Sequence, residues 1–247
     1  MTKEEFWDKI IITEEEKVKS EHFLRFRGIE AHEKVRIFLN SLTGKKVTYS
    51  SIATAFRYDK RIRRIIYKYI GFLEESIRAY IANNYSNRIK ELNCLSKVSS
   101  LCVNKTLFES LNELTFNELK NQVCSLSNED KINIFPFYKK KISNLKNDLK
   151  AAVALRNEIS HNRFLLDNKR LLSCSVGDRN NSLWANVINL HNLLPEYLKK
   201  EYLLEIRNSC KSSNNKFDNQ AKYNNQTKWE LLPQIVILIE NIDDSIN

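Results

Sequence analysis

The sequence predicts an all-α fold, and three observations carry this prediction. Apolar residues make up 42% of the 247 positions, which is ample for a packed core. Four Gly and three Pro supply almost none of the turn chemistry that β-hairpins require. In the longest patterned stretches, apolar side chains recur at the 3.6-residue period of an amphipathic helix. We therefore expect helices that are joined by short polar loops.

The first part of the chain predicts several short helices. Residues 2–26 are acidic and amphipathic, which is typical of one or two short helices. Residues 30–42 predict another helix, which Gly44 ends. Thr48 is a suitable N-cap for a short helix that continues through Phe56.

A long helix is predicted next, over residues 59–85. Asp59 is expected at its start, where a carboxylate interacts favourably with the helix dipole. The residues predicted for its inner face share the helical period and are Ile62, Ile66, Tyr69, Ile70, Leu73, Ile77 and Ile81.

The strongest helical pattern spans residues 136–166, with Pro136 expected in its first turn. We expect this helix, near 137–160, to pack against the helix at 59–85. Its predicted apolar stripe consists of Ile142, Leu145, Leu149, Ala152 and Ile159. Arg156 is in phase with that stripe, and an inward guanidinium requires a carboxylate, a phosphate or a polar cleft. His161 lies five residues on, so the two side chains share a face only if the helix ends between them.

Composition and apolar period predict the structure of the remaining segments. Two or three short helices are expected within 93–130, and a polar loop over 168–181. Helices are expected at 183–193, 196–210 and 231–242, with a mobile polar segment at 211–227. These features predict an N-terminal helical extension at 1–44, a helical core at 45–170 and C-terminal helices at 171–247.

Charge is concentrated in the two long helical stretches. The net charge of +10 divides into +6 for residues 57–90, +7 for residues 131–170 and −3 for the rest. This distribution favours a polyanionic partner at those segments, although a solvated basic surface without a ligand remains an alternative.

Other compositional signals exclude several function classes. The five cysteines lack close pairs and nearby histidines, which argues against a metal site and a disulfide framework. No cofactor-binding loop, catalytic carboxylate pair or nucleophile elbow is present. There is no apolar run of membrane length and no signal pattern, so we expect a soluble cytoplasmic protein without a membrane partner.

The Arg156–His161 pair also has structural explanations. Glu74 follows the inner face of the 59–85 helix, so it could pair with an inward Arg156 or form a local ion pair with Arg78. His161 could be a C-terminal capping residue. A second copy of the spacing, Arg27 and His32, is interrupted by Gly28 and is interpreted as accidental. The other histidines are expected at packing or surface positions.

One Arg, one His and a basic surface suffice for cleavage of RNA without a metal. The ribose 2′-OH is the nucleophile, a histidine can transfer a proton, and an arginine can stabilise the charge on the phosphorane. DNA lacks the 2′-OH and is not expected as a substrate. The cations expected to hold RNA are Arg61, Arg63, Arg64, Lys139, Lys140, Lys141 and Arg163. Tyrosines of the 59–85 helix are expected mainly in core or interface positions.

The run from Leu155 to Asn162, LRNEISHN, resembles the Arg–polar–His signature of the HEPN superfamily, and more narrowly the Abi family of abortive-infection proteins. The segment DKRIR at 59–63 and the Glu74–Arg78 pair are similar to that family's Asp-x-x-Leu-Arg and Glu-x-x-x-Arg motifs. The resemblance covers roughly residues 47–168. Arg163 departs from HEPN toxins that carry a regulatory tyrosine at this position.

The resemblance implies a HEPN-like helical bundle in which Arg156 and His161 are catalytic. Asn157 would orient the site, Glu74 and Arg78 would support it, and two motifs would meet across the two-fold axis of a homodimer. The implied function is that of a toxin-like endoribonuclease in bacterial phage defence, restrained by a bound small RNA or a partner. Two alternatives stay open: a non-catalytic module that binds a structured small RNA, and a dimerisation subunit.

Overall fold

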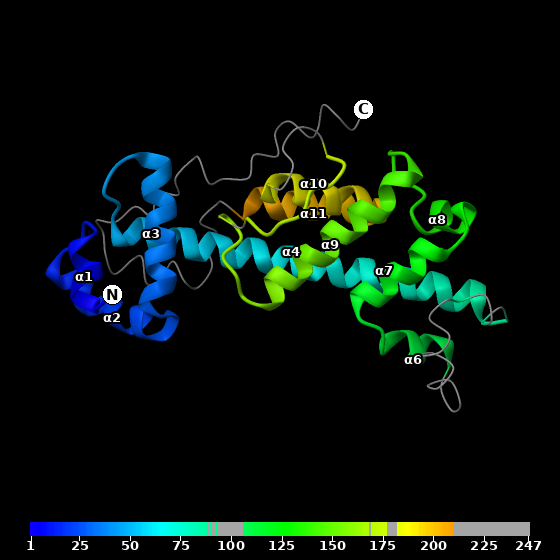
Figure 1. Ribbon diagram of the computed structural model, residues 1–247, viewed down its shortest axis with the longest axis horizontal. Helices are drawn as coiled ribbons and strands as arrows, with labels where there is room; N and C mark the ends of the chain where they lie inside the picture. Colours follow the sequence, from blue (N-terminus) through cyan, green and yellow to red (C-terminus); the bar gives the residue numbers. More distant parts are fainter. Residues whose placement is uncertain (88, 90–91, 93–105, 168, 177–181, 210–247) are drawn as a thin grey trace. The chain divides into compact units, whose positions relative to one another are not determined.

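The computed structural model describes residues 1–87, 89, 92, 106–167, 169–176 and 182–209, and its elements within these ranges are helices (Figure 1). The predicted all-α class is confirmed. An isolated β-bridge joins Ile11 to Thr48. No helix in the described ranges is both long and apolar enough to cross a bilayer.

The internal contacts divide the chain into two compact units. Unit 1 comprises Met1–Ile62 and, among the described residues, 206–209, whereas unit 2 comprises Arg63–Glu205. Two helices, α4 (Tyr49–Tyr85) and α11 (Glu196–Asn208), contribute to both units. The boundaries expected at residues 44 and 170 followed composition rather than contacts, and they stay a prediction.

Unit 1 contains α1 (Lys3–Asp8), α2 (Glu14–Arg27), α3 (Ile29–Thr43) and the beginning of α4. The acidic N-terminal region therefore forms two helices. Thr2 and Thr13 begin them with capping boxes, because the threonine hydroxyl accepts from the N3 amide and the N3 glutamate accepts from the threonine amide. Gly44 ends α3 in the left-handed conformation, at φ 66°. The Thr-x-x-Glu spacing of the two capping boxes and the glycine after α3 are visible in the sequence.

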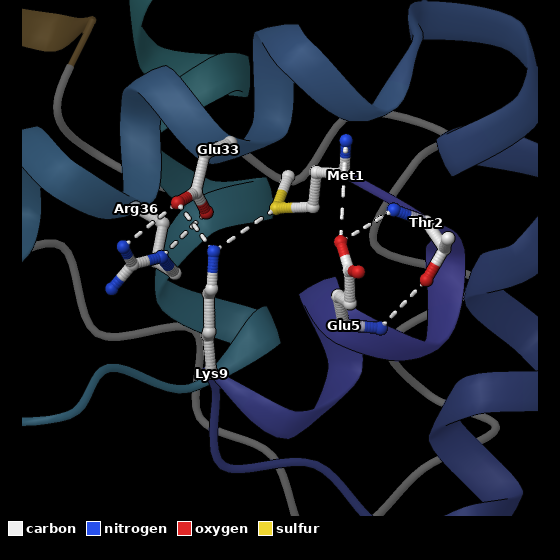
Figure 2. A network of polar contacts seen from close by, with 6 residues as sticks. All are labelled: Met1, Thr2, Glu5, Lys9, Glu33 and Arg36. Carbon is white, nitrogen blue, oxygen red and sulfur yellow. Dashed lines mark hydrogen bonds and ion pairs between the residues drawn. The ribbon is translucent and has the colours of Figure 1, made fainter.

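Polar contacts also join α1 to α3 in unit 1 (Figure 2). Lys9 Nζ lies 3.4 Å from Glu33 Oε1, and Arg36 donates two hydrogen bonds to the same carboxylate, at 2.6 and 2.9 Å. Unit 1 also contains an aromatic cluster that includes His32, which is 1% exposed and stacks on Tyr49. His32 is thus a packing residue, and the Arg27–His32 spacing forms no exposed histidine site.

One helix, α4, replaces the two helices predicted between residues 48 and 85. Thr48 does cap its beginning, since the Thr48 hydroxyl accepts from the Ser51 amide at 3.1 Å. No Gly or Pro interrupts the helix before Asp59, which is 1% exposed and lies within it rather than at its start. The predicted inner face is correct, because all seven residues named for it are at most 1% exposed: Ile62, Ile66, Tyr69, Ile70, Leu73, Ile77 and Ile81.

Unit 2 combines the rest of α4 with three short helices, α6 (Leu107–Asn112), α7 (Phe116–Ser125) and α8 (Asn128–Ile134). They are followed by the 3-10 helix η2 (Ile142–Asn144), α9 (Leu145–Ser160), α10 (Leu183–Leu193) and most of α11. The short helices expected within 93–130 and those at 183–193 and 196–210 are thereby found. The segments 211–227 and 231–242 lie outside the described residues.

The predicted start of the motif helix is wrong. Phe135 precedes a proline and is therefore disfavoured in the helical region, so α8 ends at Ile134 and Pro136 begins no helix. Residues 136–141 connect α8 to η2, and α9 begins only at Leu145. The Tyr138 hydroxyl donates to Asp148 Oδ2 at 2.7 Å, which ties this connection to the first turn of α9.

The core of unit 2 surrounds α9, which packs against both α7 and α10. Its buried surface is consequently wider than the predicted stripe and includes Asp148, Ala151, Val153 and Leu155. Ile142 of the predicted stripe is half-buried in η2. Asn189 of α10 donates to the Asp148 carbonyl at 2.9 Å, so polar as well as apolar contacts position α9.

Candidate functional site

Glu74 is the centre of a polar cluster that includes two arginines of unit 2. Its Oε2 accepts a hydrogen bond from Arg78 Nη2 at 3.0 Å, and its Oε1 lies 3.9 Å from Arg156 Nε. The side chains of Glu74 and Arg78 are 13% and 12% exposed, whereas that of Arg156 is 35% exposed. The two alternative partners that the sequence predicts for Glu74, Arg78 and Arg156, therefore both lie beside it, and Arg78 is bound more closely.

Arg78 also donates hydrogen bonds to two backbone carbonyls. Its Nε donates to the Leu111 carbonyl at 3.1 Å, and its Nη2 donates to the Leu114 carbonyl at 3.2 Å. These carbonyls lie in the last turn of α6 and just after the helix, and the Leu111 carbonyl also accepts from the Leu114 amide at 3.2 Å. Arg78 consequently joins α4 to the α6–α7 connection, which is a positioning role rather than a site for a ligand.

His161 lies at the other side of the predicted motif, where α9 ends. Asn162 adopts φ 52°, and its amide donates to the Ile159 carbonyl at 2.9 Å. The Arg163 amide donates to the Glu158 carbonyl at 3.1 Å. These two bonds form a Schellman motif with His161 as the C-cap, so the helix end is ordered rather than frayed.

The residues that follow His161 in the chain make polar side-chain contacts with α4 and α9. Arg63 Nη1 of α4 donates to Asn162 Oδ1 at 3.0 Å, and Arg163 Nη1 donates to Glu158 Oε1 at 2.6 Å. His161 itself is exposed. The cap therefore orders the His161 backbone, and the two residues that follow it in the chain, Asn162 and Arg163, are tethered to α4 and α9.

Within one copy of the chain, Arg156 and the residue after His161 contact different parts of α4. The Arg156 guanidinium contacts Glu74, whereas the residue after His161 contacts Arg63. Glu74 and Arg63 are eleven residues apart on α4, roughly 16 Å along a helix axis. The contacts thus show that the last turns of α9 run antiparallel to α4, and that the predicted pair does not share a contact point on it.

The other predicted site residues have varied environments. Asn157 is exposed on α9, and Arg64, Lys139 and Lys141 are exposed as well. Lys140 hydrogen-bonds the carbonyl and the hydroxyl of Ser175, so it braces the loop after α9. Arg61 is half-buried and belongs to unit 1.

The sequence patterns assign no specific role to two residues near the site, Asn162 and Glu158. Asn162 follows the end of a helical pattern, and an asparagine is a recognised C′ residue in the left-handed conformation, so this signal was readable. Glu158 is 7% exposed and pairs with Arg163. Its inward position follows from packing of the helix end, which local sequence does not specify.

The arrangement offers acid–base and electrostatic chemistry. An exposed imidazole can exchange a proton with a bound molecule, and the neighbouring guanidinium groups can attract an anion. In the described ranges, no group of three or more His, Cys, Asp or Glu side chains is placed to hold a metal ion.

Comparison of the chain with protein-family models, with curated proteins and with solved structures found no match in any of the three.

Proposed function

We propose that this chain is a metal-independent endoribonuclease of the HEPN type. The observation that carries the proposal is the exposed His161 at the ordered end of α9, followed in the chain by Asn162, which accepts a hydrogen bond from Arg63, and by Arg163. The sequence resemblance supplies the family, and the basic surface of the two motif helices supplies the attraction for RNA. By the same resemblance, the biological role would be that of an effector in bacterial phage defence.

The proposed reaction uses the nucleophile that RNA itself carries. His161 would assist proton transfer as the 2′-OH attacks the adjacent phosphate and the 5′-oxygen leaves. Arginine would stabilise the negative charge that develops on the non-bridging oxygens. The products would be a 2′,3′-cyclic phosphate and a 5′-hydroxyl. Asn157, exposed one turn before His161, would contribute a hydrogen bond to the substrate.

Arg156 would act across a homodimer interface. Its contact with Glu74 is longer than a hydrogen bond, so it can be exchanged for a phosphate at little cost. By the family resemblance, a composite site would combine His161 of one copy with Arg156 of another.

One observation favours a second candidate, a module that binds RNA without cleaving it. Glu74 is shared between Arg78 and Arg156, and Arg78 also binds two backbone carbonyls. A structural cluster of this kind would explain Glu74, Arg78 and Arg156 without catalysis. In that case His161 would be one contact of a basic RNA-binding surface.

Cleavage by purified protein separates the two candidates. We expect the full chain to cut RNA in the presence of EDTA and to leave cyclic phosphate ends. A single 2′-deoxy nucleotide at the scissile position should prevent cleavage there. His161→Ala should lower the cleavage rate by roughly a hundredfold or more, with RNA affinity retained.

His22→Ala is the matched control, because His22 is an exposed histidine on α2. This variant should cleave at the wild-type rate. Loss of cleavage in EDTA, or wild-type cleavage by the His161→Ala protein, would reject the nuclease mechanism. RNA binding that survives such a result would support the second candidate.

A further inference from the structure

Unit 2 contains a cleft that the proposed cleavage site does not use. Its volume is about 650 Å³, and its walls come from α4, α8, residues 135–138 and the junction of α10 and α11. Every residue that lines it lies within unit 2. The volume is within the range of roughly 300–1,000 Å³ that is usual for clefts that bind small organic groups.

Aromatic side chains form much of this cleft. Tyr80, Tyr138, Phe137 and Tyr197 all line it. Tyr197 is 79% exposed and Phe137 is 48% exposed, so these two rings are not buried in the core. Exposed aromatic rings that line a cleft are suitable surfaces for stacking a flat, apolar group.

The walls around these rings are held in place by polar contacts. Lys199 Nζ donates to the Phe137 carbonyl at 3.3 Å and lies 5.5 Å from the centroid of the Phe137 ring. The Tyr80 hydroxyl donates to Asp130 at 3.2 Å. The Tyr138 hydroxyl binds Asp148, as described above. The segment that carries Phe137 is therefore attached to both α9 and α11.

The polar groups in the cleft match the edge of a nucleobase. Asn133 and Asn192 line it. The Asn133 amide hydrogen-bonds the Tyr80 hydroxyl and the Asn192 amide hydrogen-bonds His191, but a carboxamide has two N–H donors and two acceptor lone pairs, so each keeps capacity for a ligand. Donors and acceptors alternate along the edges of purines and pyrimidines, and asparagine is a common partner for them. The combination of stacking surfaces and amides is the one that recognition of unpaired RNA bases uses.

The charges in and around the cleft favour a base that belongs to a strand. Among its described lining residues there is no Lys or Arg, and Glu196 is paired with Lys199 at 3.0 Å. The interior therefore provides no site for a free nucleotide's phosphates. Exposed Lys139 and Lys141, by contrast, follow Phe137 closely in the chain and can meet a phosphate outside the cleft.

We propose that this cleft binds an unpaired base of a single-stranded RNA. The inference rests on the proposed function in one respect, which is that RNA is the ligand of unit 2. The cleft is separate from the cleavage site, because Tyr138 lies beside Asp148 and His161 is thirteen residues later on α9, roughly 20 Å along the axis. It would contribute affinity and a preference for particular bases rather than chemistry.

Fluorescence anisotropy with a labelled, single-stranded 2′-O-methyl RNA of twelve nucleotides tests this binding, since the blocked 2′-oxygen prevents cleavage. Tyr197→Ala should weaken binding on the order of tenfold, which is the loss expected when one base loses its stacking partner. Tyr197→Phe keeps the ring and should bind within about twofold of wild type. Phe26→Ala removes an aromatic side chain that is 88% exposed on α2, so it is the matched control and should also bind as wild type.

An abasic strand of the same length identifies what the cleft recognises. It should bind more weakly than the RNA, and Tyr197→Ala should not weaken it further. Equal binding of the RNA by the wild-type and Tyr197→Ala proteins would overturn the inference. The inference would also be overturned if Tyr197→Ala weakened binding of the abasic strand as much as binding of the RNA. The same holds if millimolar mononucleotides displaced the labelled RNA as effectively as the unlabelled strand does.

The outcomes distinguish this inference from the proposed nuclease. Cleavage by wild-type protein together with unchanged binding by Tyr197→Ala would reject the cleft and keep the nuclease. Base-dependent binding that Tyr197→Ala removes, without any cleavage, would reject the nuclease and keep the cleft.

Discussion

Glu74 shows how a single carboxylate can serve two arginines unequally. It accepts a hydrogen bond from Arg78, but its distance to Arg156 Nε, 3.9 Å, is beyond hydrogen-bonding range. The Arg156 Nε atom is buried and has no hydrogen-bond partner. Arg156 is therefore the less firmly held of the two cations, which is what the proposed exchange of Glu74 for a phosphate requires.

This difference predicts different stabilities for two alanine variants. Arg78→Ala removes an ion pair and two hydrogen bonds to carbonyls at a site that is only 12% exposed. Its free energy of unfolding should fall by about 2–4 kcal/mol. Arg156→Ala should cost less than about 1 kcal/mol, because Glu74 keeps Arg78 and a buried unsatisfied N–H is removed.

Urea unfolding monitored by circular dichroism measures both variants. Arg64→Ala, an exposed arginine of the same helix, serves as the control and should stay within about 0.5 kcal/mol of wild type. A loss for Arg156→Ala as large as that for Arg78→Ala would assign Arg156 a structural role.

At this scale, the sequence could predict side-chain faces but not tertiary partners. The helical period placed Glu74 near the inner face of α4, and Arg156 in phase with the buried residues of α9. The carbonyls of Leu111 and Leu114 could not be predicted as partners of Arg78, because every residue carries the same carbonyl. Local spacing supplies the candidate charges, and packing decides which of them meet.

The ends of α9 show what could be predicted for whole elements. Its C-terminal end was close to the prediction, since polar residues and Asn162 follow the apolar period. Its N-terminal end was misplaced by nine residues, from 136 to 145, because Pro136 suits either a first helical turn or the end of the preceding element. The buried Asp148, which binds Tyr138 and Ser175, was not anticipated either. Its partners come from segments on both sides of α9.

A buried histidine of α10 makes the packing of that helix sensitive to acid. His191 is 5% exposed, and burial, followed by the charge of Lys199, lowers its pKa to about 4 from an ordinary value of 6.5. Glu196 nearby has the opposite, smaller effect. The folded protein therefore keeps His191 neutral at pH values where the unfolded chain binds a proton.

Because the folded-state pKa is lowered, stability should be complete above pH 6.5 and should decrease as the pH falls toward 4. The contribution of His191 between pH 7.5 and pH 5 is about 2 kcal/mol. His191→Gln carries no titrating group, so its free energy of unfolding should depend less on pH by about this amount. Burial also lowers the pKa of His32, so some dependence should remain.

Urea titrations at several pH values between 5 and 7.5 provide the measurement. His22→Gln changes an exposed histidine and should reproduce the wild-type pH dependence. The same slope for His191→Gln and wild type would show that His191 is accessible to protons in the folded protein.

At the scale of the whole molecule, the proposed function depends on assembly. The helical class followed directly from composition and period, because few Gly and Pro residues interrupt the amphipathic patterns. The meeting of two copies leaves no such local signal, since an interface uses surface residues that can equally face solvent. Each copy of unit 2 contains an exposed His161 and an Arg156 that is held only by a 3.9 Å contact with Glu74.

A mixing experiment tests whether Arg156 of one copy and His161 of another form one site. Neither the Arg156→Ala protein nor the His161→Ala protein should cleave RNA appreciably alone, because every site in each homodimer lacks one of the two groups. After the two variants are mixed and allowed to exchange subunits, heterodimers should contain one site with an intact arginine and an intact histidine. Cleavage should then rise at least tenfold above either variant, on the scale of one recovered acid–base group.

Mixing each variant with an Arg156→Ala, His161→Ala double variant is the matched control, since no such heterodimer contains both groups. These mixtures should stay as inactive as the single variants. Native mass spectrometry of differently tagged subunits verifies that exchange occurs. Proven exchange without recovered cleavage would contradict a site that is shared between copies, and Arg156 would then belong with Arg78 and Glu74 to the support of the fold.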